Sequence, residues 1–198
     1  MKSWIIKCVS VSALLLSATF ANAVDIQPNS LYPQVEFDTS AGKIVVELDR
    51  TRAPLTVDNF LTYVVTGHYD GTLFHRVIAD FVVQGGGLDV KQEERPTQKP
   101  IVNESGNGLK NELGTIAMAR EANPHSASSQ FYFNMADNKN LDPSSRRWGY
   151  AVFGEVTSGM EVLAAMAQTP TDFNSKLGWP DFPVTDIVLN KATLLPRE

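Results

Sequence analysis

An arginine stands in the middle of an apolar, strand-like run in the segment FHRVIADFVVQGGG, residues 74 to 87. Arg76 has two interpretations. It could form an ion pair on an edge strand, which is the default for an isolated arginine. Alternatively, its guanidinium could be held in place to donate hydrogen bonds to a bound substrate. Other segments of the chain are needed to decide between the two.

The glycines that follow this run, Gly85, Gly86 and Gly87, lack the pattern of a phosphate-binding loop. Such a loop continues into a Lys-Ser or Lys-Thr pair and a helix, and neither follows here. We predict a sharp turn at these glycines.

Metal and hydrolase chemistry have little support in the sequence. The three histidines, His68, His75 and His125, show neither the i, i+4 spacing nor the Cys or carboxylate neighbours of metal-ligand motifs. Ser128 and Ser129 lack the GxSxG turn of the serine hydrolases. We therefore expect the protein to need no metal ion and no cofactor.

The first 23 residues have the pattern of a secretory signal peptide. Lys2 and Lys7 are followed by an apolar stretch and then by the small-residue pattern Ala21-Asn22-Ala23. A membrane anchor is the alternative, but the apolar stretch is short and contains serines. We predict cleavage after Ala23, which leaves one domain of residues 24 to 198 with no stable membrane insertion.

Composition indicates which cellular compartment and which kinds of partner fit this domain. The chain has 198 residues, 43% hydrophobic and 20% charged, which suits one soluble domain, and we expect a monomer. Its formal net charge is −5, and loss of Lys2 and Lys7 would make it −7, so we expect no nucleic-acid partner. The only cysteine, Cys8, lies in the signal peptide. A thiol-free domain fits an oxidising compartment, for which we predict the periplasm, with secretion as the other possibility.

Periodicity predicts many short strands and two helices. An alternating pattern around a Ser-Ala-Gly turn indicates a hairpin over residues 35 to 49, and apolar residues at helical spacing indicate a helix from Pro54 to the stop at Gly67. A capping box of Ser158 and Glu161 predicts the start of the second helix. Further strands are predicted at residues 73–78, 81–84, 114–119, 130–135, 151–156 and 186–195, and residues 88–112 are predicted to form a long surface segment. This pattern favours a closed antiparallel barrel whose ends the helices cover.

Five segments, FHRVIADFVVQGGG, GTIAMAR, SSQFYFN, NLD and YAVFGEV, together resemble the cyclophilin-type peptidyl-prolyl isomerases in order and spacing. The resemblance covers nearly all of the chain after the signal peptide and is closest to the periplasmic cyclophilins of Gram-negative bacteria. It implies a mainly β fold, a closed eight-stranded antiparallel barrel with two capping α-helices. It also implies a catalyst of rotation about Xaa-Pro bonds that assists the folding of exported proteins.

The resemblance assigns roles to nine residues of this sequence. It implies that Arg76 and Gln84 are catalytic. The substrate-binding residues that it implies are Phe81, Val82, Ala119, Gln130, Tyr132, Leu141 and Tyr150. On this view Arg76 donates a hydrogen bond to the proline nitrogen, which becomes an acceptor as the planar amide twists.

Several positions depart from the usual pattern of the family. Val82 stands where methionine is common, Tyr132 where phenylalanine is usual, and Tyr150 where many eukaryotic members have histidine. We expect these changes to be tolerated, although the Tyr132 hydroxyl needs water or a partner. Asn140 replaces an aromatic residue at the pocket rim, which predicts weak binding of the inhibitor cyclosporin. Trp148 is a candidate to compensate for that loss.

A second class of function stays open at this point. The same fold could hold proline-containing segments as a chaperone or adaptor with little catalysis, because capture needs the pocket but not a donor to the twisting nitrogen. The presence of both Arg76 and Gln84 favours the enzyme.

Overall fold

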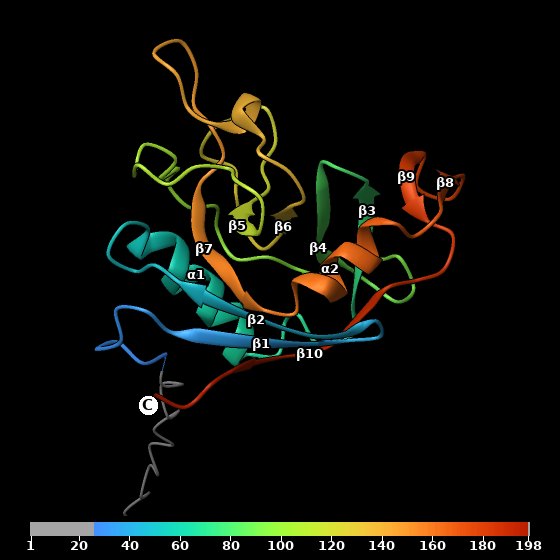
Figure 1. The fold of residues 1–198 in the computed structure, drawn as a ribbon, viewed down its shortest axis with the longest axis horizontal. Coiled ribbons are helices and arrows are strands. Elements are labelled where there is room, and N and C mark those ends of the chain that lie inside the picture. Colours follow the sequence, from blue (N-terminus) through green and yellow to red (C-terminus); the bar gives the residue numbers. More distant parts are fainter. Residues whose placement is uncertain (1–25, 198) are drawn as a thin grey trace, which may run out of the picture.

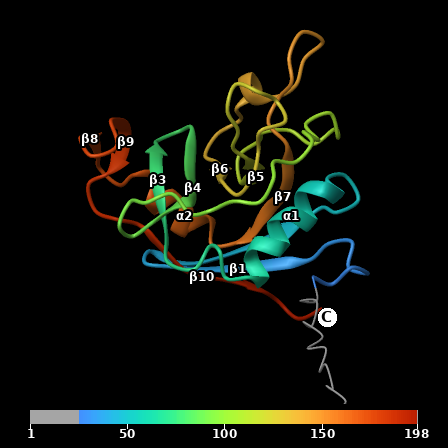
Figure 2. The ribbon, with the colours of Figure 1, turned by 180° about the vertical axis from the view of Figure 1, so that it is seen from behind.

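The computed structural model describes residues 26–197, and its main feature is a closed barrel of eight antiparallel strands (Figures 1 and 2). The strands follow one another around the barrel in the order β1-β10-β3-β4-β6-β5-β7-β2, and β2 pairs with β1 to close it. They are β1 (Gln34–Thr39), β2 (Gly42–Leu48), β3 (Thr72–Ile78), β4 (Val82–Asp89), β5 (Thr115–Met118), β6 (Phe131–Asn134), β7 (Val152–Ser158) and β10 (Val188–Leu194). The predicted fold class and the predicted hairpin are confirmed.

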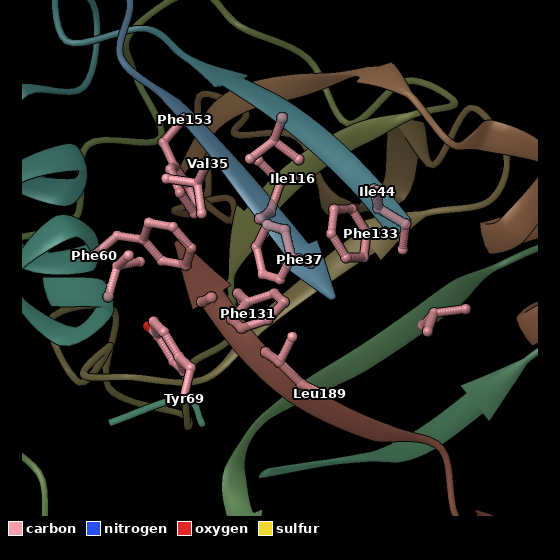
Figure 3. Packing of buried hydrophobic residues seen from close by; sticks show 14 of the residues in the cluster. Val35, Phe37, Ile44, Phe60, Tyr69, Ile116, Phe131, Phe133, Phe153 and Leu189 are labelled. Carbon is pink, nitrogen blue, oxygen red and sulfur yellow. The ribbon is translucent and has the colours of Figure 1, made fainter. Parts of the chain in front are cut away.

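Aromatic side chains fill the barrel (Figure 3). Phe37 of β1 lies 5.4 Å, ring centroid to ring centroid, from Phe131 of β6. Phe60 reaches in from the first helix and meets Phe131 edge-on at 5.6 Å. Because side chains alternate between the two faces of a strand, Phe131 and Phe133 point into this core and Tyr132 must point out of it. The barrel thus sets which side of β6 is available for a site.

The two helices lie on opposite sides of the barrel (Figures 1 and 2). α1 (Pro54–Val65) begins with its proline in the first turn, as predicted. α2 (Met160–Ala167) does not begin with the predicted capping box. Ser158 is the last residue of β7, and the N-cap is Gly159 in a left-handed conformation with no side-chain cap hydrogen bond. A Cβ on Gly159 would lie 2.3 Å from the carbonyl oxygen of Lys43, so the close passage beside β2 excludes a serine cap there.

The prediction of a sharp turn at the three glycines is wrong, because Gly85, Gly86 and Gly87 continue strand β4 to Asp89. The glycines are required by packing. A Cβ on Gly85 would lie 2.9 Å from the Phe74 ring, and a Cβ on Gly86 would lie 2.8 Å from the Phe131 ring. The absence of side chains allows β4 to run directly against the aromatic core.

A second, two-stranded sheet was not predicted. β8 (Thr171–Asn174) and β9 (Trp179–Pro183) form a hairpin that packs against β3 through a small apolar cluster of Leu73, Leu88 and Phe182. Exposed positions dominate β8, so it lacks the apolar alternation that would have marked it. No helix within residues 26–197 is both long enough and apolar enough to span a membrane.

Candidate active site

The site is built on a row of residues that crosses four neighbouring strands. Arg76 of β3 pairs with Gln84 of β4, Gln84 pairs with Tyr132 of β6, and Tyr132 pairs with Ala117 of β5. Residues directly opposite each other in a sheet place their side chains on the same face. Since Tyr132 points away from the barrel core, the whole row lies on the outside.

An apolar cluster surrounds this row, separate from the core of the barrel. Its buried members are Val82, Ala117, Tyr132 and Val152, and its half-buried members are Phe81, Leu109, Ala119, Leu141 and Tyr150. Packing of the barrel core does not explain apolar side chains on its outer face. A binding surface does explain them.

A pocket of about 300 Å³ opens in this cluster. The residues that line it are Arg76, Phe81, Val82, Gln84, Ala119, Arg120, Tyr132, Leu141 and Tyr150. Eight of the nine site residues named from the sequence are therefore brought together. The ninth, Gln130, lies next to the pocket, where its Oε1 accepts a hydrogen bond from Gln84 Nε2 at 3.0 Å.

Gly87 makes room for Gln130. A Cβ on this glycine would lie 2.6 Å from Nε2 of the Gln130 side chain, closer than any real contact allows. Gln130 in turn holds the Gln84 amide at the polar side of the pocket. The last glycine of the run thus allows a site residue to pack against β4, whereas the first two allow core rings to do so.

Arg76 lies on the polar side of the pocket, with a side chain 37% exposed. Strand β3 belongs to the closed barrel and is not an edge strand, although β10 pairs with it only at Thr72 and Leu73, and Arg76 pairs with Gln84 of β4 alone. Within the described residues, its single ion pair joins Nε to Asp181 Oδ2 at 3.9 Å. A pair this long and this exposed contributes about 0–1 kcal/mol. The guanidinium carbon also lies 5.9 Å from the centre of the Phe81 ring.

The Tyr132 hydroxyl has the partner that it was expected to need. It donates to Asn111 Oδ1 at 2.8 Å, and Asn111 Nδ2 donates to Asp142 Oδ1 at 3.0 Å. Burial raises the pKa of Tyr132 well above its ordinary value, so the hydroxyl stays protonated. The ring forms a wall of the pocket, while the hydroxyl is anchored to the loops beneath it.

Two residues near the pocket were missed from the sequence. Arg120 lines the pocket and stacks on Tyr150, with the guanidinium carbon 4.5 Å from the ring centre. Its position directly after Ala119 in the GTIAMAR segment was the available signal. Asp181 reaches Arg76 only because the unpredicted hairpin packs on β3. No local sequence pattern indicated this contact.

Neither Asn140 nor Trp148 lines the pocket with the residues above. Asn140 lies in a short 3₁₀ turn, Lys139–Leu141, and its side chain is exposed. Trp148 is 49% exposed and meets the His125 ring edge-on at 5.2 Å. It lines a different hollow, with Ser105 and residues 143–147. Trp148 therefore lines a hollow other than the pocket, and only its carbonyl oxygen contacts a lining residue, Arg120.

The three histidines pack against different aromatic residues. His75 is buried, with its ring 5.6 Å from Trp179, and burial lowers its pKa to about 4. His68 packs on Tyr63 at 4.4 Å, and burial lowers its pKa as well. Across residues 26–197 there is no group of three or more His, Cys, Asp or Glu side chains that could hold a metal ion.

Comparison with known proteins agrees with this geometry. The family model for the cyclophilin type peptidyl-prolyl cis-trans isomerases matches residues 34–193. The peptidyl-prolyl cis-trans isomerase cyp18 of Streptomyces antibioticus is 50% identical over 164 residues, which cover 81% of this chain and 98% of that protein. Peptidyl-prolyl cis-trans isomerase B of Escherichia coli is 42% identical over 163 residues, with the same two coverages.

A solved structure supports the fold. The cyclophilin type isomerase of Cryptosporidium parvum superposes with a TM-score of 0.69 at 23% identity, covering 84% of this chain and 99% of its own. The family match spans all of the barrel except its last residue, Leu194, and includes every residue that lines the pocket. The chain belongs to the cyclophilin-type peptidyl-prolyl cis-trans isomerases.

Proposed function

We propose that this isomerase acts on Xaa-Pro bonds of exported polypeptides, and that Arg76 supplies the hydrogen bond that lowers the barrier to rotation. The observation that carries the proposal is the placement of a guanidinium and an apolar pocket side by side on the outer face of the barrel. One chain supplies every lining residue, so a monomer suffices.

The chemistry needs no bond to break. Rotation about the peptide bond costs about 18–20 kcal/mol because the planar amide loses its resonance. As the bond twists, the proline nitrogen becomes pyramidal and its lone pair becomes an acceptor, which the planar amide does not offer. A donor from Arg76 therefore binds the twisted state more strongly than the ground state, and this difference is what accelerates a reaction.

The apolar wall acts in the same direction. A planar amide is more polar than a twisted one, so removing water from it beside Phe81, Val82 and Leu141 disfavours the reactant more than the transition state. To gain roughly 10⁴-fold in rate, the donor and the wall together must contribute about 5.5 kcal/mol. Gln84, fixed by Gln130, holds the peptide on the polar side of the pocket.

The deciding experiment measures cis/trans exchange of a short Ala-Pro peptide with the mature protein, Arg76→Ala and Arg76→Lys. Loss of a charged donor worth about 2–3 kcal/mol should slow catalysis by on the order of 30- to 150-fold in the alanine variant. Lysine should also be impaired, because a point charge does not reproduce a planar fork. Folding of both variants is checked by circular dichroism.

Two results would count against the proposal. Wild-type rates in both variants would remove Arg76 from the mechanism. Tight binding of proline peptides without acceleration by the wild type would instead favour a chaperone or adaptor that only captures these segments.

Export to the periplasm rests on residues 1 to 23, which lie outside the residues that the structure describes. The prediction is cleavage after Ala23. Mass spectrometry of the protein recovered from the periplasm of a Gram-negative host should therefore find Val24 at the N-terminus. A soluble mature form that begins at Met1 would contradict the signal peptide.

A further inference from the structure

Two guanidiniums line the pocket on the outer face of the barrel, those of Arg76 and Arg120, and they differ in their charge partners. Arg76 has the carboxylate of Asp181 at 3.9 Å. Among the described residues, Arg120 forms no ion pair within 4.0 Å. The pocket wall therefore carries one positive charge that no side chain of this part of the chain neutralises.

Arg120 is nevertheless held in a fixed position. Its Nη1 donates to the carbonyl oxygen of Glu121 at 2.8 Å and its Nη2 to that of Trp148 at 3.1 Å. Its Nε donates to the carbonyl oxygen of Gly149 at 3.3 Å, and the guanidinium stacks on Tyr150. A guanidinium has five N–H donors, so these contacts leave one on each Nη free for a ligand.

The segment that joins two of the lining residues, Leu141 and Tyr150, adds further positive charge. It carries Arg146 and Arg147, both exposed. Its one acidic residue, Asp142, already accepts hydrogen bonds from the backbone nitrogen and Nδ2 of Asn111. This segment thus adds a net charge of +1 beside the pocket, in a chain whose formal net charge is −5.

We propose that Arg120 is a specificity-determining residue, and that the pocket favours proline segments with a carboxylate side chain directly before or after the proline. The proposal rests on the isomerase function argued above. The backbone carbonyls that fix the guanidinium carry no net charge, so they leave its attraction for an anion in place. A substrate carboxylate is the partner that Arg120 lacks.

The size of the effect follows from the exposure of the site. Half-buried and exposed ion pairs contribute little in water, and a gain of this kind corresponds to about two- to fivefold in kcat/KM. Charges of this kind are also screened by salt, with a Debye length of about 10 Å at 0.1 M. Both the preference and its loss in salt can therefore be measured.

The experiment compares matched peptides by nuclear magnetic resonance exchange at pH 7 and low salt. One pair, Ala-Glu-Pro-Ala and Ala-Gln-Pro-Ala, varies the residue before the proline, and the other, Ala-Ala-Pro-Glu-Ala and Ala-Ala-Pro-Gln-Ala, varies the residue after it. The readout is the ratio of kcat/KM for the Glu peptide to that for the Gln peptide. This ratio cancels any general loss of activity in a variant.

We expect a ratio of about two to five for the wild type in at least one pair, and a ratio near one for Arg120→Gln. Lys43→Gln is the matched control, because it removes the same charge from the β1–β2 hairpin, where Lys43 is 64% exposed and pairs with Glu36. It should keep the wild-type ratio. Arg120→Lys keeps the charge without the full set of carbonyl contacts and should retain a ratio above one.

Three outcomes would overturn the proposal: a wild-type ratio of one or less in both pairs, an undiminished ratio in Arg120→Gln, or a wild-type ratio that 0.5 M salt leaves unchanged. The salt series uses the wild type alone, so it tests the electrostatic origin of the preference even if a variant folds poorly. If the wild type accelerates neither the Glu nor the Gln peptides, the isomerase function fails instead, and the two failures are distinguishable.

Discussion

Removal of the Tyr132 hydroxyl tests how this wall of the pocket is held in place. In Tyr132→Phe the ring stays in place and the hydrogen bond to Asn111 Oδ1 is lost. That oxygen keeps a second donor, Asn134 Nδ2 at 3.2 Å, so the substitution leaves no acceptor unpaired. The expected cost is that of one neutral buried hydrogen bond, about 0.5–1.5 kcal/mol in the free energy of unfolding.

The contrasting variant is Asn111→Ala. It removes the acceptor for the Tyr132 hydroxyl and for Asn134 Nδ2, and it removes the donor to Asp142 Oδ1. The hydroxyl is buried with its ring, and a buried polar group without a partner costs about 1–3 kcal/mol. Asn111→Ala should therefore destabilise the protein more than Tyr132→Phe does.

The two substitutions should not add. Once Asn111 is alanine, the Tyr132 hydroxyl is the unpaired group, so its removal should be neutral or stabilising. Urea unfolding of the wild type, both single variants and the double variant at pH 7 measures this coupling. An equal cost of Tyr132→Phe in both backgrounds would refute the reasoning, since the hydroxyl would then have no energetic link to Asn111.

Two further predictions follow from buried and exposed groups near the site. Burial lowers the pKa of His75 to about 4 from an ordinary 6.5, so the folded protein resists protonation of this side chain. The stability that depends on neutral His75 is therefore fully present above about pH 6.5. It is lost as the pH falls toward 4, by up to about 3 kcal/mol in the free energy of unfolding. Unfolding of His75→Gln over the same range should show a shallower loss, and parallel curves would exclude His75 as the cause. Asn140→Trp should tighten cyclosporin binding by roughly 1–3 kcal/mol in a calorimetric titration, which is the contribution of one packed ring and its hydrogen bond. Tight binding by the wild type, or no gain in the variant, would show that Asn140 does not limit cyclosporin affinity.

Alternation and helical spacing were sufficient to predict most elements of the barrel, because each strand buries one face and each helix one stripe. They failed where the controlling contact is distant in sequence. The sequence predicted a turn at the glycine run, because the rings that require Gly85 and Gly86, those of Phe74 and Phe131, lie on two other strands, β3 and β6. Likewise, the Ser158 capping pattern carries no information about the Lys43 carbonyl that forces glycine at the next position.

The site was predictable to the extent that the family motifs carry it. Without the family motif, the sequence could not say which of Phe131, Tyr132 and Phe133 faces the pocket, because all three are large aromatic residues. The register of the barrel makes that distinction. Arg120 follows directly after a motif residue, Ala119, and could have been included on that ground. Asp181 depends on a hairpin without alternation, so it required the folded chain.

The rim of the pocket shows how one residue can control shape and charge together. At Asn140 the expected aromatic residue is absent, and Trp148 packs on His125 instead. The aromatic wall is supplied by Tyr150, which meets the Tyr132 ring at 5.9 Å and is covered by the Arg120 guanidinium. Because the same guanidinium binds the carbonyl oxygens of Trp148 and Gly149, just before Tyr150, a substitution at Arg120 changes the position of the wall as well as its charge. Arg120→Gln should therefore change both the affinity for proline segments and the selectivity for acidic ones. Arg120→Lys retains only the charge, so it should change the affinity and keep the selectivity.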